Sequence, residues 1–168
     1  MSGRGTRALE VVRAAGVPHV VHEYEPPGAA SPRDRDRRPS YGLDAAAALG
    51  LDPARVFKTL IATVDGELAA AVVPVANELD LKALAAALGG RKAALADPAE
   101  AERATGYVVG GLSPLGGRRR MPTVLDTSAA GFGTIFLSGG RRGLQLELAP
   151  SDLARLVGAT QAPIARLG

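Results

Sequence analysis

The sequence has 168 residues, the size of one compact domain, and 46% of them are apolar, which is enough for a hydrophobic core. No apolar run approaches the roughly 20 residues that a transmembrane helix needs, and the first residues lack the apolar stretch of a secretion signal. We therefore expect a cytoplasmic protein. Because the sequence contains no cysteine, a disulfide framework, a Cys-ligated zinc site and a cysteine nucleophile are excluded.

The formal net charge is +3, and arginine supplies almost all of the positive charge. A genome that favours alanine, arginine and glycine codons explains most of this bias, but the planar guanidinium is also well suited to binding phosphate. Arginines cluster at 33–38, 118–120 and 141–142, and clusters on one face would form a nucleic-acid-binding surface. Aromatic residues make up only 4%, so an RNA partner would be contacted at phosphates, sugars and a terminal group, with little base stacking.

The first part of the chain predicts short elements around one polar segment. Residues 6–15 predict a helix that ends at Gly16, and residues 19–24 predict a strand. Residues 25–40 combine prolines and alternating charge without apolar periodicity, which predicts a mobile charged loop inserted into the domain. A short alanine-rich helix is expected over 43–49.

The middle of the chain contains a strong hairpin signal. Residues 55–64 and 67–75 are predicted strands joined by Asp65-Gly66, and the second is apolar enough to be covered on both faces. A helix is expected over 81–88. Asp97-Pro98-Ala99-Glu100 has the pattern of a capping box with proline at the first helical position.

The last part of the chain starts with a glycine-rich loop. Strands are then expected at 123–126, 134–138 and 144–148, and a final helix begins near residue 150. Strands at uneven spacing, separated by hairpins and single short helices, predict an α+β fold. We expect one domain over residues 1–168, with a mixed or antiparallel sheet curled around the core.

Lys58 is the first residue that suggests chemistry. Strict alternation places it on a strand face whose other members, at even-numbered positions from 56 to 64, are apolar. Burying an unpaired ammonium is costly, so a lysine on such a face is unusual. Its stem can lie along apolar surface with the charge at the rim, or the charge can serve a function, and the pattern favours neither.

Two glycine clusters offer backbone donors. Residues 110–117 (GGLSPLGG) would let the backbone approach a ligand closely and present N–H groups to it, as in an oxyanion hole, although an ordinary surface loop can have the same composition. Residues 138–143 (SGGRRG) directly follow a predicted strand. His19 and His22 are expected on opposite faces of one strand, and no serine triad is evident. An enzyme built this way would work by positioning and backbone electrostatics.

Several segments together resemble a known family: VFKTL at 56–60, PVA at 74–76 before LDLK at 79–82, ADP at 96–98, TGYVVGGLSPLG at 105–116 and SGGRRGL at 138–144. The resemblance is to the YbaK-type Cys-tRNA(Pro) deacylases, relatives of the editing domain inserted in bacterial prolyl-tRNA synthetases, and it covers nearly the whole chain. It implies a small mixed β-barrel flanked by helices, with no cofactor and no metal. It also implies aminoacyl-tRNA as the substrate and prolyl-tRNA synthetase as a candidate partner.

The resemblance implies roles for individual residues. Lys58, followed by Thr59, would hold the terminal adenosine or phosphate region of the substrate. The backbone of the loop from Gly110 through Gly111 to Pro114 would grip the aminoacyl carbonyl and the 3′ end of the tRNA. The remaining predicted pocket residues are Tyr24, Tyr41 (in place of a family phenylalanine), Ser138 and Gln145, and the predicted nucleic-acid-binding residues are Arg118, Arg119, Arg141 and Arg142.

The resemblance also implies a mechanism without a protein nucleophile. In the Cys-editing members the substrate thiol attacks its own ester carbonyl, whereas related domains that remove alanine position a water. Gln145 stands where the family has an aspartate, which removes a negative charge that would help recognise the α-amino group. We expect trans-editing of Cys-tRNA(Pro). The alternatives are removal of alanine or another small residue from tRNA(Pro), and a non-catalytic tRNA- or synthetase-binding module.

Overall fold

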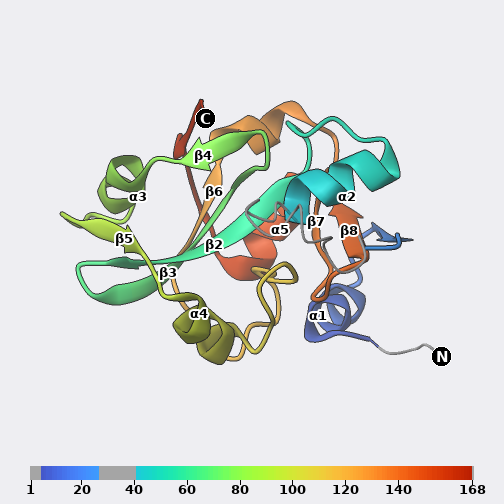
Figure 1. The fold of residues 1–168 in the computed structure, drawn as a ribbon, viewed down its shortest axis with the longest axis horizontal. Coiled ribbons are helices and arrows are strands. Elements are labelled where there is room, and N and C mark those ends of the chain that lie inside the picture. The colour runs from blue at the N-terminus through green and yellow to red at the C-terminus, as the bar shows by residue number, and fades with distance from the viewer. Residues whose placement is uncertain (1–4, 27–40, 168) are drawn as a thin grey trace, which may run out of the picture.

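The computed structural model describes residues 5–26 and 41–167, so most of the predicted insertion at 25–40 lies outside the described residues. In the described part, short helices surround three sheets (Figure 1). This arrangement confirms the predicted α+β class. The described strands are not closed into one barrel, and the fold differs from the predicted barrel in this respect.

The central element is the predicted hairpin. Strands β2 (Phe57–Val64) and β3 (Glu67–Pro74) pair antiparallel from Phe57↔Pro74 to Val64↔Glu67. Asp65 and Gly66 both have positive φ, at 51° and 85°, as the predicted two-residue turn requires. All residues of β3 after Glu67 are buried, which confirms that this strand is covered on both faces.

The hairpin lies in the middle of a five-stranded sheet with the order β5-β2-β3-β6-β9. The added strands are β5 (Ala93–Leu95), β6 (Thr123–Asp126) and β9 (Thr160–Ala162). β5 is antiparallel to β2, whereas β6 runs parallel to both β3 and β9. The sheet is therefore mixed.

Two smaller antiparallel sheets complete the fold. One has the order β1-β8-β7, from β1 (His19–Glu23), β8 (Leu144–Leu148) and β7 (Ile135–Ser138). The other pairs β4 (Asn77–Leu79) with β10 (Ala165–Leu167). A parallel bridge between Val56 and Phe136 joins the start of the hairpin to β7. Strands β4, β5, β9 and β10 were not predicted, because three residues are too few to show a period.

The helices are α1 (Arg7–Ala15), α2 (Tyr41–Leu49), α3 (Leu81–Ala87), α4 (Pro98–Thr105) and α5 (Pro150–Val157), with a 3₁₀ helix, η2 (Thr127–Gly131). Thr6 accepts a hydrogen bond from the Leu9 N–H at the start of α1, and Gly16 ends it. The Asp97 side chain makes no cap hydrogen bond in the described structure, so the predicted capping box is wrong. α4 begins with Pro98, whose fixed φ suits the first turn.

The two faces of the hairpin bury different parts of the core. The face at even-numbered positions of β2 packs against α3 through Ala62, Val64 and Leu84. Nearer the start of the hairpin, Ala46 of α2 packs on Val56 and Phe136. The other face begins with Phe57, which lies in a large cluster with residues of α1, α5 and the β1-β8-β7 sheet. Figure 1 shows α2 in front of the hairpin and α5 behind it.

Candidate functional site

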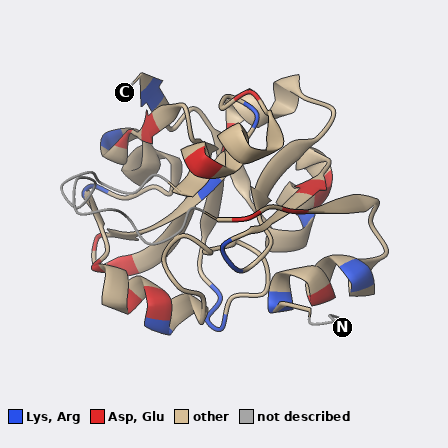
Figure 2. Ribbon diagram, turned by 45° about the vertical axis from the view of Figure 1, so that its right-hand side comes forward, with Lys and Arg blue, Asp and Glu red and all other residues tan. Residues whose placement is uncertain are grey.

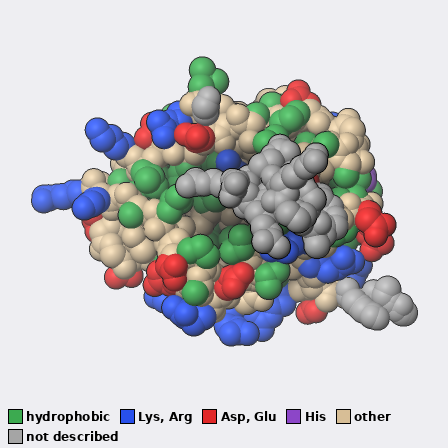
Figure 3. All heavy atoms as spheres, viewed as in Figure 1, with side chains coloured by type: hydrophobic (Ala, Val, Ile, Leu, Met, Phe, Trp, Pro, Cys, Tyr) green, Lys and Arg blue, Asp and Glu red, His purple; other side chains and the backbone are tan. Residues whose placement is uncertain are grey.

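Lys58 lies on β2 opposite Val73, on the α2 and α3 side of the hairpin. Its side chain is half-buried, and this burial lowers the pKa of the ammonium, although the carboxylate of Glu78 acts in the opposite direction. No acidic side chain in the described part of the chain forms an ion pair with it. Figure 3 shows this side of the molecule, which is hollowed near its centre with hydrophobic side chains around the hollow.

Ser138 and Gln145 form a cross-strand pair on β7 and β8. The bridge between Val56 and Phe136 is isolated, but these two residues pack in one cluster, and alternation puts Lys58 on the face of Val56 and Ser138 on the face of Phe136. Lys58 and Ser138 are therefore directed to the same side. Gln145 is only 6% exposed, and its Oε1 atom has no hydrogen-bond partner among the described residues. A buried acceptor without a donor costs free energy, which marks this oxygen as an unusual feature of the site.

The two glycine clusters, which are far apart in the sequence, pack against each other and against α2. A Cβ atom at Gly111 would lie 2.7 Å from the Arg141 Cα atom. A Cβ atom at Gly110 would lie 2.8 Å from Cγ of Tyr41 and 2.6 Å from Nε of Arg142. Only glycine allows this approach, and Gly110 also has a φ of +92°. The structure therefore brings Tyr41 and both predicted loops together.

The two predicted catalytic glycines differ in their free donors. The Gly111 N–H already donates to the Val108 carbonyl at 2.8 Å. The Gly110 N–H has no acceptor within the ranges that the structure describes. Gly110 is therefore the better candidate for an N–H that contacts a bound substrate.

Three comparisons with known proteins bear on this site. The family model of the aminoacyl-tRNA editing domain matches residues 41–156. The chain belongs to the aminoacyl-tRNA editing domain family. A relative from Enterococcus faecalis (strain ATCC 700802 / V583), named "Putative Cys-tRNA(Pro)/Cys-tRNA(Cys) deacylase EbsC", is 36% identical over 161 residues, which are 95% of this chain and 92% of the relative. The aminoacyl-tRNA deacylase class that the sequence predicts is confirmed.

Solved structures show the same fold. The "hypothetical protein APE2540" matches with a TM-score of 0.81 at 25% identity and covers 96% of this chain and 100% of its own. A "putative trans-editing enzyme for prolyl tRNA synthetase" matches with a TM-score of 0.79 at 24% identity, covering 99% of each chain. These likenesses confirm the editing-domain fold.

The remaining predicted pocket residues are Tyr24, Thr59 and Pro114. Tyr24 is half-buried, and its N–H donates to the Gly143 carbonyl at 2.9 Å, beside the second glycine cluster. Thr59 points to the opposite face of β2 from Lys58, where it is 6% exposed and its Oγ1 atom has no described partner. Pro114 lines a cavity of about 220 Å³ with Ile61 and Arg119, also on the opposite face of the hairpin. The structure thus separates Thr59 and Pro114 from the Lys58 side of this editing domain.

The four predicted nucleic-acid-binding arginines fall in two loops, one between α4 and β6 and the other between β7 and β8. Figure 2 colours all lysines and arginines of the described chain blue. Arg118 and Arg119 lie against the C-terminal end of α4, where their backbone N–H groups donate to the carbonyls of Thr105 and Ala104. Arg141 pairs with Glu23 at 3.3 Å, and both side chains are exposed. The Nη2 atom of Arg142 donates to the Tyr41 hydroxyl at 3.0 Å.

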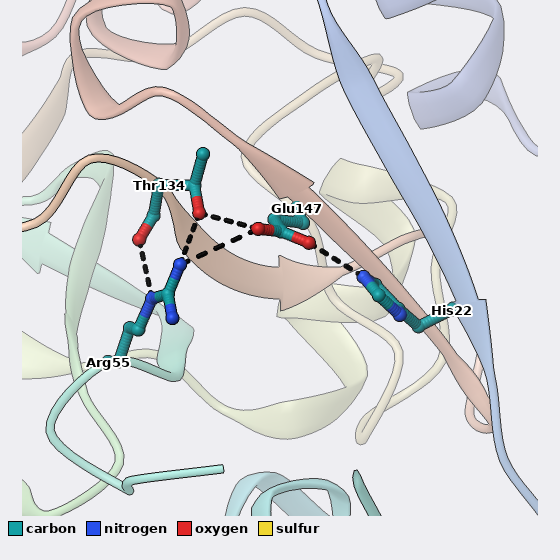
Figure 4. Close-up of polar contacts among 4 residues, drawn as sticks. All are labelled: His22, Arg55, Thr134 and Glu147. Atoms are coloured by element: carbon teal, nitrogen blue, oxygen red, sulfur yellow. Dashed lines mark hydrogen bonds and ion pairs between the residues drawn. The ribbon is translucent and has the colours of Figure 1, made fainter.

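A polar cluster beside the site was not predicted (Figure 4). The carboxylate of Glu147 on β8 lies 2.8 Å from Nε2 of His22 on β1, accepts a hydrogen bond from the Thr134 hydroxyl at 2.6 Å and pairs with Arg55 at 3.5 Å. Arg55 Nε also donates to the Thr134 carbonyl at 2.8 Å. This cluster ties the segment between α2 and β2 to the β1-β8-β7 sheet. The alternation of β8 shows Glu147 as a polar-face residue, but its partners depend on strand register.

Burial alone would raise the pKa of Glu147. The hydrogen bonds with Thr134 and His22, together with the charges of His22 and Arg55, outweigh burial, and the pKa of Glu147 is lowered as a result. The carboxylate is therefore ionised at neutral pH, and both of its oxygen atoms have protein partners. We assign it a structural role in holding the frame of the site.

Proposed function

We propose that residues 1–168 act as a single trans-editing domain that deacylates mischarged tRNA(Pro), with Cys-tRNA(Pro) as the main substrate and prolyl-tRNA synthetase as a partner. The observation that carries this proposal is the half-buried Lys58 ammonium, which has no described ion-pair partner and shares a face with Ser138 and Gln145. A cation held in this state is ready to bind a phosphate or ribose group. The name of the Enterococcus relative supports the same substrate.

Each part of the site has a task in this proposal. Lys58 binds the phosphate or terminal ribose of the tRNA as a point charge. The Gly110 N–H donates to the aminoacyl carbonyl oxygen and stabilises the negative charge that develops there when the carbonyl is attacked. Gln145 and Ser138 border the space for the small aminoacyl side chain and its amino group. Arg141 adds an electrostatic contact to the tRNA backbone.

The attack needs no nucleophile from the protein. The cysteine sulfur of the substrate attacks the ester carbonyl carbon, and a new S–C bond forms as the bond from that carbon to the ribose oxygen breaks. The thiol proton ends on the ribose oxygen. The products are a cyclic thiolactone and uncharged tRNA. The chain contains no cysteine, and the source of sulfur in this reaction is the substrate.

Gln145 favours a second candidate substrate. A neutral amide in place of a carboxylate binds the α-ammonium group less strongly, which reduces discrimination by charge and favours selection by size. Alanine attached to tRNA(Pro) would then be removed as well. That reaction requires a water as the nucleophile, because alanine has no thiol.

The test is a deacylation screen with tRNA(Pro) charged in turn with cysteine, serine, alanine and proline, and with Cys-tRNA(Cys). We expect rapid loss of cysteine and little loss of serine, because a hydroxyl is a much weaker nucleophile than a thiol. Fast release of alanine would support the second candidate, and release of alanine without release of cysteine would replace the first candidate by the second. Salt-sensitive binding of tRNA without deacylation of any of these substrates would overturn the proposal.

A further inference from the structure

Val109, the residue before the glycine pair, is held at both of its backbone polar groups. Its N–H donates to Oε2 of Glu102 on α4 at 2.7 Å. Its carbonyl accepts two hydrogen bonds from Arg142, from Nε at 3.0 Å and from Nη2 at 2.7 Å. Charged partners make these bonds stronger than ordinary backbone bonds. Charged side chains on both sides therefore hold this segment in one orientation.

Arg142 is fixed from a second side. Its guanidinium carbon lies 4.3 Å from the centre of the Tyr41 ring, and Nη2 also donates to the Tyr41 hydroxyl at 3.0 Å. Tyr41 is the first residue of α2. Three elements therefore meet at the Val109 backbone: α2 and the loop after β7 through Arg142, and α4 through Glu102.

The direction of the Val109 carbonyl sets the direction of the next N–H group. In a trans peptide the C=O and N–H bonds point in opposite directions, so the two bonds from Arg142 make the Gly110 N–H point away from the guanidinium. This N–H group has no acceptor among the described residues. Because a glycine at 110 permits many φ values, nothing in its own side chain would prevent this peptide from turning over.

We propose that Arg142 and Glu102 are positioning residues that hold the Gly110 N–H in the direction needed to meet the aminoacyl carbonyl. This inference rests on the proposed function. It gives Arg142 a role that differs from the phosphate contact expected from its place in an arginine cluster. Loss of a positioning residue should lower kcat, whereas loss of a phosphate contact should weaken tRNA binding.

The main experiment compares Arg142→Ala with the wild-type enzyme on Cys-tRNA(Pro). We expect kcat to fall by roughly 10-fold to 100-fold, because a misdirected donor stabilises the transition state poorly. The Kd for uncharged tRNA should change by less than about 3-fold, with an unchanged salt dependence. A phosphate ligand would instead weaken tRNA binding, reduce the salt slope by about 1 and leave kcat intact. The control is Arg155→Ala, which removes the same charge from the exposed surface of α5.

Arg142→Lys separates the two roles further. Lysine keeps the positive charge but lacks the planar fork that makes two bonds to the Val109 carbonyl and stacks on Tyr41. If Arg142 positions the loop, this variant should be nearly as slow as Arg142→Ala. Restoration of wild-type kcat by lysine would overturn the proposal.

A second measurement does not depend on catalysis. Hydrogen exchange of the Val109 amide, followed by NMR, should become at least about 10-fold faster in Glu102→Ala, since that amide loses a charge-assisted bond. If the wild-type protein deacylated no substrate, the proposed function would fail. This measurement would still show whether Glu102 holds the Val109 backbone. Unchanged protection of Val109 in Glu102→Ala, or wild-type kcat in Arg142→Ala, would overturn the inference.

Discussion

Lys58 and Glu147 are both partly buried charges on strands of two different sheets, β2 and β8, but their surroundings differ. Glu147 is surrounded by His22, Thr134 and Arg55, and both of its oxygen atoms have partners. Lys58 has no described ion-pair partner, and the described carboxylate that influences it, Glu78, acts only through its charge. One charge is therefore used to build the frame, and the other is left available.

The pKa directions follow from this difference. Protein partners lower the pKa of Glu147 and stabilise its charged form despite burial. Burial lowers the pKa of Lys58 and destabilises its charged form. A perturbed charge without a protein partner is a candidate for function, and by this criterion the comparison favours Lys58 over Glu147. Gln145, with an unpartnered buried oxygen, belongs with Lys58 in this respect.

The largest effect is expected for Lys58→Met, which keeps the length of the side chain and removes the charge. We expect kcat/KM for Cys-tRNA(Pro) to fall by roughly 100-fold to 1,000-fold, because a preorganised charge is lost from the site. The melting temperature should stay the same or rise, since an uncompensated charge is replaced by an apolar group. Lys82→Met, at an exposed position of α3, is the matched control. Near-normal kcat/KM in Lys58→Met would remove Lys58 from the site.

The opposite behaviour is expected for Glu147→Ala. The carboxylate is 20% exposed and bonded to three side chains, so its removal should lower the free energy of unfolding by about 2 kcal/mol, measured by urea denaturation. Because the alanine side chain lies outside the space for the substrate, kcat should change by less than about 3-fold at a temperature where the variant is folded. A loss of activity as large as that of Lys58→Met, without a loss of stability, would contradict the structural role.

The sequence predicted those parts of the site that depend on local patterns. Alternation placed Lys58 on the correct face of β2, and turn chemistry located the Asp65-Gly66 hairpin. What could not be predicted depends on contacts between distant segments. The pairing of Glu147 with His22 requires the register of β1 and β8. The role proposed for Arg142 could not be predicted without the contact between the two glycine clusters. In the sequence, an arginine that binds phosphate looks the same as one that holds a loop backbone in place.

The smallest effect is expected in the pH dependence of stability, where Glu147→Gln provides the comparison. Because the folded-state pKa of Glu147 is lowered, its charge stabilises the wild-type protein above the ordinary value of 4.5. That contribution is lost as the pH falls through the lowered folded-state pKa. The difference in unfolding free energy between wild type and Glu147→Gln should therefore shrink as the pH falls below about 5. A difference that grew below about pH 5 would mean that the folded-state pKa of Glu147 is raised, and the contrast with Lys58 would be lost.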